Sequence, residues 1–276
     1  MKKFACGIPL YHPDSQAIQR IKKYVGAFCK IYLYDNTENG TDDKLKIKLE
    51  NINDIEWLGN GNNSGLSVAY NQMCQIAYKD GMDFLTIFDQ DSYPEIKYIK
   101  KMQSYITNTQ RQDVAVYGPY ICKSKDIKPV DEVESVDVLI SSGSFINLHI
   151  YKTTTGFDEK IFIDKVDDDY CLMTRSLGYD IVKHKGVLLY HRIGDIKHIF
   201  GKEIEQHSPL RMYYIARNTL YVNHKYGRSS MSGWLWLIDR IRHVALYDDD
   251  KISKIKMMLK GAIDYKKNKL GKYEAS

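Results

Sequence analysis

Strand-like and helix-like segments alternate along the first 90 residues, and this alternation constrains the fold more than any other feature of the sequence. Short apolar runs predict strands at residues 4–9, 31–34, 55–58 and 84–88. Between them, apolar side chains follow a helical spacing at residues 15–28 and 66–77, and residues 44–50 are expected to form a charged helix. Such alternation favours a mostly parallel sheet with helices on both faces, so we expect an α/β fold.

After residue 92 the pattern is less regular but stays mixed. Further strands are predicted at residues 114–117, 136–140, 144–148 and 181–190, and helices at 96–106 and, after an acidic cluster, up to about 177. From residue 208 onward the spacing is helical, with an apolar stripe at 234, 237, 238, 241, 244 and 245. We therefore expect a main domain over residues 1–225 and a C-terminal helical extension over residues 226–276.

Two carboxylates, Asp89 and Asp91, follow the strand predicted at 84–88. In an extended segment, side chains two residues apart point to the same side. Adjacent carboxylates repel each other, and a divalent cation such as Mg²⁺ or Mn²⁺ would remove that repulsion. The pair therefore indicates a metal–diphosphate site at the carboxyl end of a strand, where open α/β sheets bind ligands. A solvated turn at the strand end is the alternative.

The composition narrows the class of protein. With 276 residues, 43% hydrophobic and 27% charged, the chain has ordinary globular composition. Its net charge of +5 does not indicate nucleic acid as a partner, and fits anionic small substrates or an anionic membrane surface. The five cysteines include no Cys-x-x-Cys pair, so neither zinc nor a disulfide framework is expected. No apolar run approaches the roughly 20 residues of a membrane span, and no signal peptide is evident, so we expect a cytoplasmic protein.

Several motifs occur in a defined order along the chain. They are Tyr34-Asp35-Asn36-Thr37, Asn63-x-Gly65-x-x-x-Ala69-x-Asn71, Phe88-Asp89-Gln90-Asp91-Ser92, Ser142-Gly143-Ser144, Phe162-Ile163-Asp164-x-Val166-Asp167-x-Asp169, His191-x-x-Gly194 and Arg211-x-x-Tyr214-x-x-Arg217-Asn218. As an ordered set they resemble family 2 inverting glycosyltransferases of the GT-A fold, a Rossmann-like nucleotide-binding mixed sheet flanked by helices. Within that family they are most similar to bacterial rhamnosyltransferase-type enzymes of surface polysaccharide synthesis.

The resemblance implies roles for residues of the donor site. Asp35 is expected to read the pyrimidine base of the donor, or else to form an Asx turn. Asp89 is expected near the ribose, and Asp91 is expected to bind the metal, Mn²⁺ or Mg²⁺. The remaining residues assigned to nucleotide-sugar binding are Pro9, Asn63, Asn71 and Gln90.

Three late residues are assigned to the diphosphate end of the donor or to its metal. His191 matches a frequent extra metal or diphosphate contact, with a buried structural histidine as the alternative. Arg211 and Arg217 are expected to bind the diphosphate or the acceptor, because the arginine fork matches phosphate oxygens. Solvated helix charges are the alternative for both arginines.

The acidic cluster supplies the expected general base. Asp167 lies where the family has the carboxylate that deprotonates the acceptor hydroxyl. The family usually has an arginine six positions later, whereas this chain has Met173 there and Arg175 two residues further on. Asp168 and Asp169 are therefore kept as alternatives for the base. Stabilisation of a helix N-terminus, about 0.3–1 kcal/mol per acid, is the structural alternative for such a cluster.

The resemblance implies transfer of a sugar from a nucleotide diphosphate donor, with dTDP-rhamnose favoured, to a hydroxyl of a glycan or polyprenyl-linked glycan. The product would belong to a capsule, an O-antigen or a cell wall. A transferase that uses a UDP-hexose or UDP-galactofuranose is the alternative, and an inactive nucleotide-sugar-binding scaffold is another. The C-terminal helices, with Trp234, Trp236 and many lysines, are expected either on the inner face of the plasma membrane or packed against the main domain or a second subunit.

Overall fold

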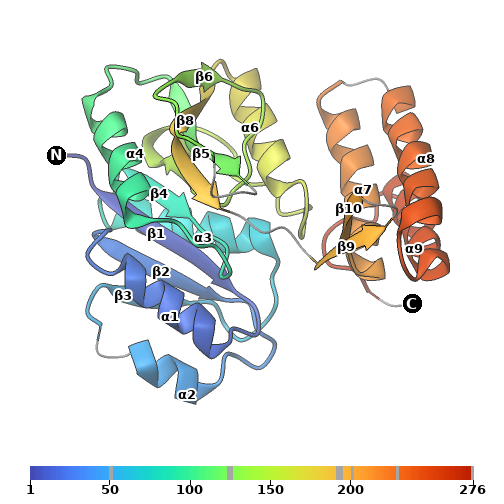
Figure 1. Cartoon of the computed structure of the whole chain (residues 1–276), viewed down its shortest axis with the longest axis horizontal. Coiled ribbons are helices and arrows are strands. Elements are labelled where there is room, and N and C mark those ends of the chain that lie inside the picture. Colours follow the sequence, from blue (N-terminus) through green and yellow to red (C-terminus); the bar gives the residue numbers. More distant parts are fainter. Residues whose placement is uncertain (50–51, 123–126, 191–194, 200–201, 228–229, 275–276) are drawn as a thin grey trace.

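The computed structural model describes residues 1–49, 52–122, 127–190, 195–199, 202–227 and 230–274. Within these ranges, an eight-stranded mixed sheet forms the centre of the main domain (Figure 1). Its strands are β1 (Phe4–Leu10), β2 (Lys30–Asp35), β3 (Ile55–Leu58), β4 (Phe84–Ile87), β5 (Val114–Cys122), β6 (Val133–Ser135), β7 (Ser144–Asn147) and β8 (Asp180–Tyr190). The strand order is β3-β2-β1-β4-β7-β5-β8-β6.

The half of the sheet predicted from the strand–helix alternation is parallel. β1 pairs in parallel with both β2 and β4, and β2 pairs in parallel with β3. β7 then runs antiparallel to β4 and β5, which makes the sheet mixed. The carboxyl ends of β1, β2 and β4 consequently meet at one edge of the sheet.

Helices cover both faces of the sheet, as expected. The main-domain helices are α1 (Ser15–Tyr24), α2 (Asp43–Lys46), the 3₁₀ helix η1 (Ile47–Leu49), α3 (Leu66–Lys79), α4 (Ile96–Asn108), α5 (Leu148–Tyr151) and α6 (Val166–Ser176). Side chains of α1 and α4 share a buried cluster with Phe84 and Phe88, whereas α3 and α6 share another with Leu85 and Ile87. Alternate residues of β4, together with Phe88, which follows it, thus supply the cores on opposite faces.

One predicted helix boundary and one predicted strand are wrong. The first helix ends at Tyr24 rather than near residue 28, because Gly26 follows with a φ of 78° that other residues rarely adopt. Residues 136–140 do not form a strand; the edge strand is β6, three residues earlier. Leu139, in this irregular stretch, is nevertheless buried. Its burial explains the apolar pattern that suggested a strand.

The C-terminal part consists of a β-hairpin and three helices. They are β9 (Asp195–Ile199), β10 (Lys202–Gln206), α7 (Pro209–Lys225), α8 (Ser230–Tyr247) and α9 (Lys251–Lys266). The three helices share a core that includes Met212, Leu237 and Met258. α7 also contacts the main domain, where its Asn218 donates to the carbonyl oxygen of Ile163 at 2.7 Å. None of the helices in the described ranges has the length and apolarity to cross a membrane.

Candidate active site

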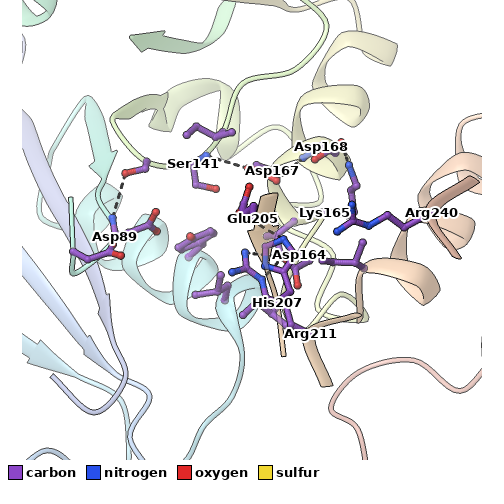
Figure 2. A pocket seen from close by; sticks show the side chains of 18 of the residues that line it. Asp89, Ser141, Asp164, Lys165, Asp167, Asp168, Glu205, His207, Arg211 and Arg240 are labelled. Carbon is purple, nitrogen blue, oxygen red and sulfur yellow. Dashed lines mark hydrogen bonds and ion pairs between the residues drawn. The ribbon is translucent and has the colours of Figure 1, made fainter. Parts of the chain in front are cut away.

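A cavity of about 810 Å³ lies where the carboxyl end of β4 faces the C-terminal helices (Figure 2). On the main-domain side it is lined by Asp89, Asp91, Ser141, Lys165, Asp167 and Asp168, among others. The opposite side, here called the helical wall, comprises Glu205, His207, Arg211, Trp236, Arg240 and His243. The cavity therefore collects the strand-end acids, the acidic cluster and basic side chains of α7 and α8.

Asp89 and Asp91 both line this cavity, as their spacing predicted. Phe88, between the strand and the acids, is buried and stacks on Tyr24 with ring centroids 5.1 Å apart. The turn is tied to a neighbouring loop, because the hydroxyls of Ser92 and Ser142 lie 2.6 Å apart. Burial of the strand end thus fixes where the following carboxylates emerge.

The oxygen atoms that could ligate a metal at this turn suit a hard divalent cation. Asp89 and Asp91 offer only carboxylate oxygens, and Asp91 is exposed. Within the described ranges no group of three or more His, Cys, Asp and Glu side chains is arranged to hold a metal. A site of one or two protein carboxylates fits Mg²⁺-type ions that take their remaining ligands from water and substrate phosphates. His191, the other expected ligand, lies outside the described residues.

Gln90 and Pro9 lie near the strand ends but do not line the cavity. The side-chain amide of Gln90 accepts from the backbone N–H of Tyr11 and donates to its carbonyl oxygen, both at 3.0 Å. Gln90 therefore fastens the loop after β1. Pro9 is paired in register with Tyr34 of β2. The structure brings both residues to the edge of the sheet, with Gln90 in a positioning role.

Asp35 is buried at the end of β2 and is held by its own loop. One carboxylate oxygen accepts from the Thr37 N–H at 3.1 Å and the Thr41 hydroxyl at 2.8 Å. The other accepts from the Thr41 N–H at 2.7 Å and lies 3.2 Å from Lys46 Nζ. Burial alone raises the pKa of Asp35, but these donors outweigh it and leave the pKa below its ordinary value. The carboxylate is thus ionised and oriented, and the Thr37 contact has the form of an Asx turn.

Asn63 lies at the entry to α3. Its side-chain oxygen accepts from the Gly65 N–H at 3.2 Å. Gly65 has a φ of 85°, and a Cβ there would lie 2.6 Å from the carbonyl oxygen of Phe162. A residue with a side chain is therefore excluded, and α3 starts close against the segment that leads to α6.

Asn71 and Arg217 are not brought to the cavity. The Asn71 amide donates to Phe157 O at 2.9 Å and accepts from Phe157 N at 2.8 Å, so it holds that loop in place. Arg217 is fully buried and donates to the carbonyl oxygens of Gly271 and Lys269 at 2.7 and 3.4 Å. It secures the C-terminal segment to α7. Both residues have structural roles in the described structure.

The turn that starts α6 has an unusual backbone. Asp164 and Lys165 both have positive φ, 58° and 69°. Arg211 of α7 donates to the Asp164 carboxylate from Nε and Nη2, and Asn218 donates to the Asp164 carbonyl oxygen at 3.1 Å. Arg211 therefore lines the cavity as expected but is already paired with an acid. Helix α7 holds the strained turn in place.

Asp167 projects from the first turn of α6 into the cavity. Its carboxylate accepts from the backbone N–H of Ser141 at 3.2 Å and of Asp168 at 3.0 Å. Burial, followed by the negative charge of Asp168, raises the pKa of Asp167 to about 7. A carboxylate with this pKa, open to a cavity, suits a general base at neutral pH.

The two alternative bases differ in placement. Asp168 lines the cavity and pairs with Lys165 at 2.8 Å. Asp169 is buried away from it and binds Lys225 at 2.8 Å and the Tyr226 hydroxyl at 3.0 Å. Burial raises the pKa of Asp169, although Lys225 opposes that shift. Asp169 therefore ties α6 to α7.

Sequence reasoning missed most of the helical wall. The sequence assigns no role to His207, Arg240 and His243, and it assigns Trp236 to a membrane or packing surface, although all four line the cavity. The α8 residues occur at intervals of four and three, which place them on one helix face. This spacing is the signal that the sequence offers. It identifies a shared helix face, but it does not show that the face lines a cavity.

Comparisons with known proteins agree with the fold and the family. A family model described as glycosyl transferase family 2 matches residues 16–175. The chain is 31% identical over 218 residues to the dTDP-rhamnosyl transferase RfbF of Shigella flexneri, covering 71% of each protein.

Solved structures share the fold at low identity. S. aureus TarS 1-349 in complex with UDP-GlcNAc has a TM-score of 0.55 at 14% identity, over 95% of this chain and 80% of that one. GalNAc-T7 with UDP, GalNAc and Mn²⁺ has a TM-score of 0.61 at 12% identity, over 97% of this chain and 58% of that one. The predicted GT-A architecture with C-terminal helices is confirmed. By its sequence match and its relative, the chain belongs to glycosyl transferase family 2.

Proposed function

We propose that the protein transfers rhamnose from dTDP-rhamnose to a hydroxyl group of a glycan, with inversion, during synthesis of a surface polysaccharide. One observation carries the proposal: Asp91 at the strand end and Asp167, whose pKa is raised, line the same cavity. The name of the relative RfbF, dTDP-rhamnosyl transferase, supports the choice of donor. A UDP-linked hexose is the competing donor.

The donor would bind at the strand ends. Asp35 would read the pyrimidine base, and its low pKa keeps it ionised for accepting a hydrogen bond from the base. Asp91, with Asp89 beside it, would hold Mn²⁺ or Mg²⁺. When bound, the cation would neutralise charge that develops on the leaving diphosphate.

Asp167 would act as the general base. Its carboxylate is held in place by the N–H groups of Ser141 and Asp168, with the remaining lone pairs available to an acceptor hydroxyl. As the acceptor oxygen bonds to the anomeric carbon, the bond from that carbon to the diphosphate breaks on the opposite face. The hydroxyl proton passes to Asp167. One displacement inverts the anomeric centre and needs no covalent enzyme intermediate.

A thermal-shift panel tests the donor assignment. The protein is melted with Mn²⁺ and dTDP, UDP, GDP or ADP, and the panel is repeated with Asp91→Ala and with Asp54→Ala, which removes an exposed acid that does not line the cavity. A ligand at 100 times its Kd stabilises the native state by about 2.7 kcal/mol. We expect a Mn²⁺-dependent shift with dTDP that Asp91→Ala alone abolishes. A larger shift with UDP would replace the donor, and no shift with any nucleotide would refute the proposal.

The proposal also places the protein on the inner face of the plasma membrane, where a polyprenyl-linked acceptor would lie. The outer faces of α8 and α9 expose large apolar side chains, namely Met231, Leu235, Ile238, Leu246, Ile252, Leu259 and Ile263. Exposed basic residues, Arg242 on α8 and Lys256 and Lys266 on α9, lie among them in sequence. Apolar stripes with basic residues suit an anionic bilayer, where each cation contributes about 1 kcal/mol.

A further inference from the structure

Trp236, Arg240 and His243 form one face of α8, directed into the cavity. Arg240 Nη1 lies 3.4 Å from His243 Nδ1, and Arg240 Nη2 lies 4.0 Å from the sulfur of Met212. Neither contact supplies a negative charge. Trp236 is one helical turn before Arg240, so an aromatic ring and a guanidinium are adjacent on the same face.

The other cations of the cavity have acidic partners. Arg211 pairs with Asp164, and Lys165 pairs with Asp168. Among the residues that the structure describes, Arg240 forms no ion pair with a carboxylate, although it is partly buried. A half-buried guanidinium without an anionic partner is a ready site for one, because a planar fork binds phosphate oxygens through two hydrogen bonds.

Cations and an acid both lie around Arg240: Asp248 Oδ1 is 3.6 Å from His243 Nδ1, the nitrogen that also contacts Arg240. His207, on the same wall, has its pKa lowered to about 4, first by burial and then by the charges of Arg211 and Arg240. Its Nδ1 is buried and has no hydrogen-bond partner in the described structure. Glu205 is the acid of this wall and lies 3.5 Å from His207 Nε2. Arg211 and Arg240 thus place two guanidinium groups on the helical wall, and only Arg211 is paired with a described carboxylate.

The position of Arg240 separates it from the donor acids. In Figure 2, Asp89 and Arg240 lie at opposite ends of the labelled side chains, with Asp167 between them. If Asp91 and Asp89 hold the donor diphosphate, the sugar being transferred lies between them and the base. A group beyond the base, on the far side from the diphosphate, faces the acceptor.

From this arrangement we infer that the helical wall is an acceptor subsite for a phosphorylated saccharide, with Arg240 bound to its phosphate or diphosphate group. Trp236 would pack against the sugar ring, as aromatic side chains commonly do in ligand pockets. His243 would support the Arg240 guanidinium. The inference rests on the proposed function, since the donor site defines which end of the cavity is left for the acceptor.

Calorimetric titration of the protein saturated with Mn²⁺ and dTDP tests the subsite. The probes are glucose 1-phosphate, methyl glucoside and inorganic phosphate. We expect glucose 1-phosphate to bind at least about tenfold more tightly than either of the others, since only it offers both a sugar and an anion. Equal binding of the methyl glucoside would overturn the anionic character of the subsite. Equal binding of inorganic phosphate would show an anion site with no role for a saccharide.

Variants of α8 distinguish the acceptor subsite from a donor contact. Arg240→Gln should weaken glucose 1-phosphate about tenfold or more, with Arg240→Lys intermediate and dTDP affinity unchanged. Arg242→Gln, on the exposed side of the same helix, should match the wild type. If Arg240→Gln weakens dTDP by the same factor, Arg240 belongs to the donor site and the inference fails. If wild-type protein does not bind dTDP at all, the proposed function fails instead.

Discussion

Nε and Nη2 of Arg211 each lie 3.1 Å from the same carboxylate oxygen of Asp164. This contact joins α7 to the turn that starts α6, three residues before Asp167. The second Asp164 oxygen is buried and has no hydrogen-bond partner among the described residues. The position of the candidate base therefore depends on a charge pair contributed by a helix far along the chain.

Removing Arg211 should destabilise the protein. Arg211→Met leaves the Asp164 carboxylate buried without its cation, which would lower the free energy of unfolding by about 1–2 kcal/mol. The figure is kept low because the Arg211 side chain is 41% exposed and solvent screens the pair. Urea unfolding of Arg211→Met, Asp164→Asn and the double variant measures the effect. Strict additivity of the two single changes would contradict the pairing.

The same variant should respond to pH in a defined direction. Burial raises the pKa of Asp164 even with Arg211 present, and loss of Arg211 raises it further. A carboxyl with a raised pKa in the folded state destabilises that state most when pH lies above the folded pKa. The destabilisation by Arg211→Met should thus be largest at neutral pH and shrink as pH falls and Asp164 takes up a proton. A loss that grows on acidification would rule out this account.

Asp167→Asn should remove the general base and preserve the donor site. Turnover should fall by roughly 10²–10⁴-fold, the usual contribution of a positioned base. The Kd for dTDP with Mn²⁺ should stay near the wild-type value, because the proposal assigns donor and metal binding to Asp35, Asp89 and Asp91. Steady-state rates and calorimetry give the two quantities. Asp168→Asn is the comparison, and a larger loss there than in Asp167→Asn would move the base by one residue.

The raised pKa of Asp167 predicts an acid limb near pH 7 in the profile of kcat/KM. A base acts only when ionised, so activity should fall as pH drops through the pKa of Asp167. Asp168→Asn removes a neighbouring negative charge and frees Lys165, and both changes should move the limb to lower pH. Asp137→Asn, an exposed acid outside the cavity, should leave the limb in place. If the acid limb does not move in Asp168→Asn, the limb does not report the ionisation of Asp167.

The nucleotide half of the fold was predictable because its signals are local. The strands near residues 31, 55 and 84 are fixed by short apolar runs between helical segments, and β4 ends where the acids begin. Asp89, Asp91 and Asp167 were assigned from their motifs, and the structure brings them to one cavity. Neighbours in sequence and strand ends in a parallel sheet leave few alternative arrangements.

The remaining predictions depended on contacts that sequence spacing does not encode. Asn71 and Arg217 have polar side chains within their motifs. Both side chains nevertheless form hydrogen bonds with backbone groups more than 50 residues away. Arg240 and His243 look like the polar face of an ordinary amphipathic helix until α8 is placed against the cavity. Such assignments need the packing of α7 and α8, which is long-range information.

The exposed stripe of α8 predicts binding to anionic membranes. Leu235 and Ile238 are 58% and 48% exposed, and Arg242 is four residues beyond Ile238. We expect the protein to co-sediment with phosphatidylglycerol vesicles, less with phosphatidylcholine vesicles, and less in high salt because surface attraction is screened. Leu235→Glu with Ile238→Glu should abolish this binding, since charged groups resist burial among lipid chains.

Leu177 provides a matched control, because it is 55% exposed but lies at the end of α6 in the main domain. Leu177→Glu should leave vesicle binding unchanged. Sedimentation without lipid separates the membrane from a second copy of the chain as the partner of the stripe. A dimer that Leu235→Glu with Ile238→Glu dissociates, together with no binding to vesicles, would show that the stripe is a subunit interface and would contradict the membrane prediction.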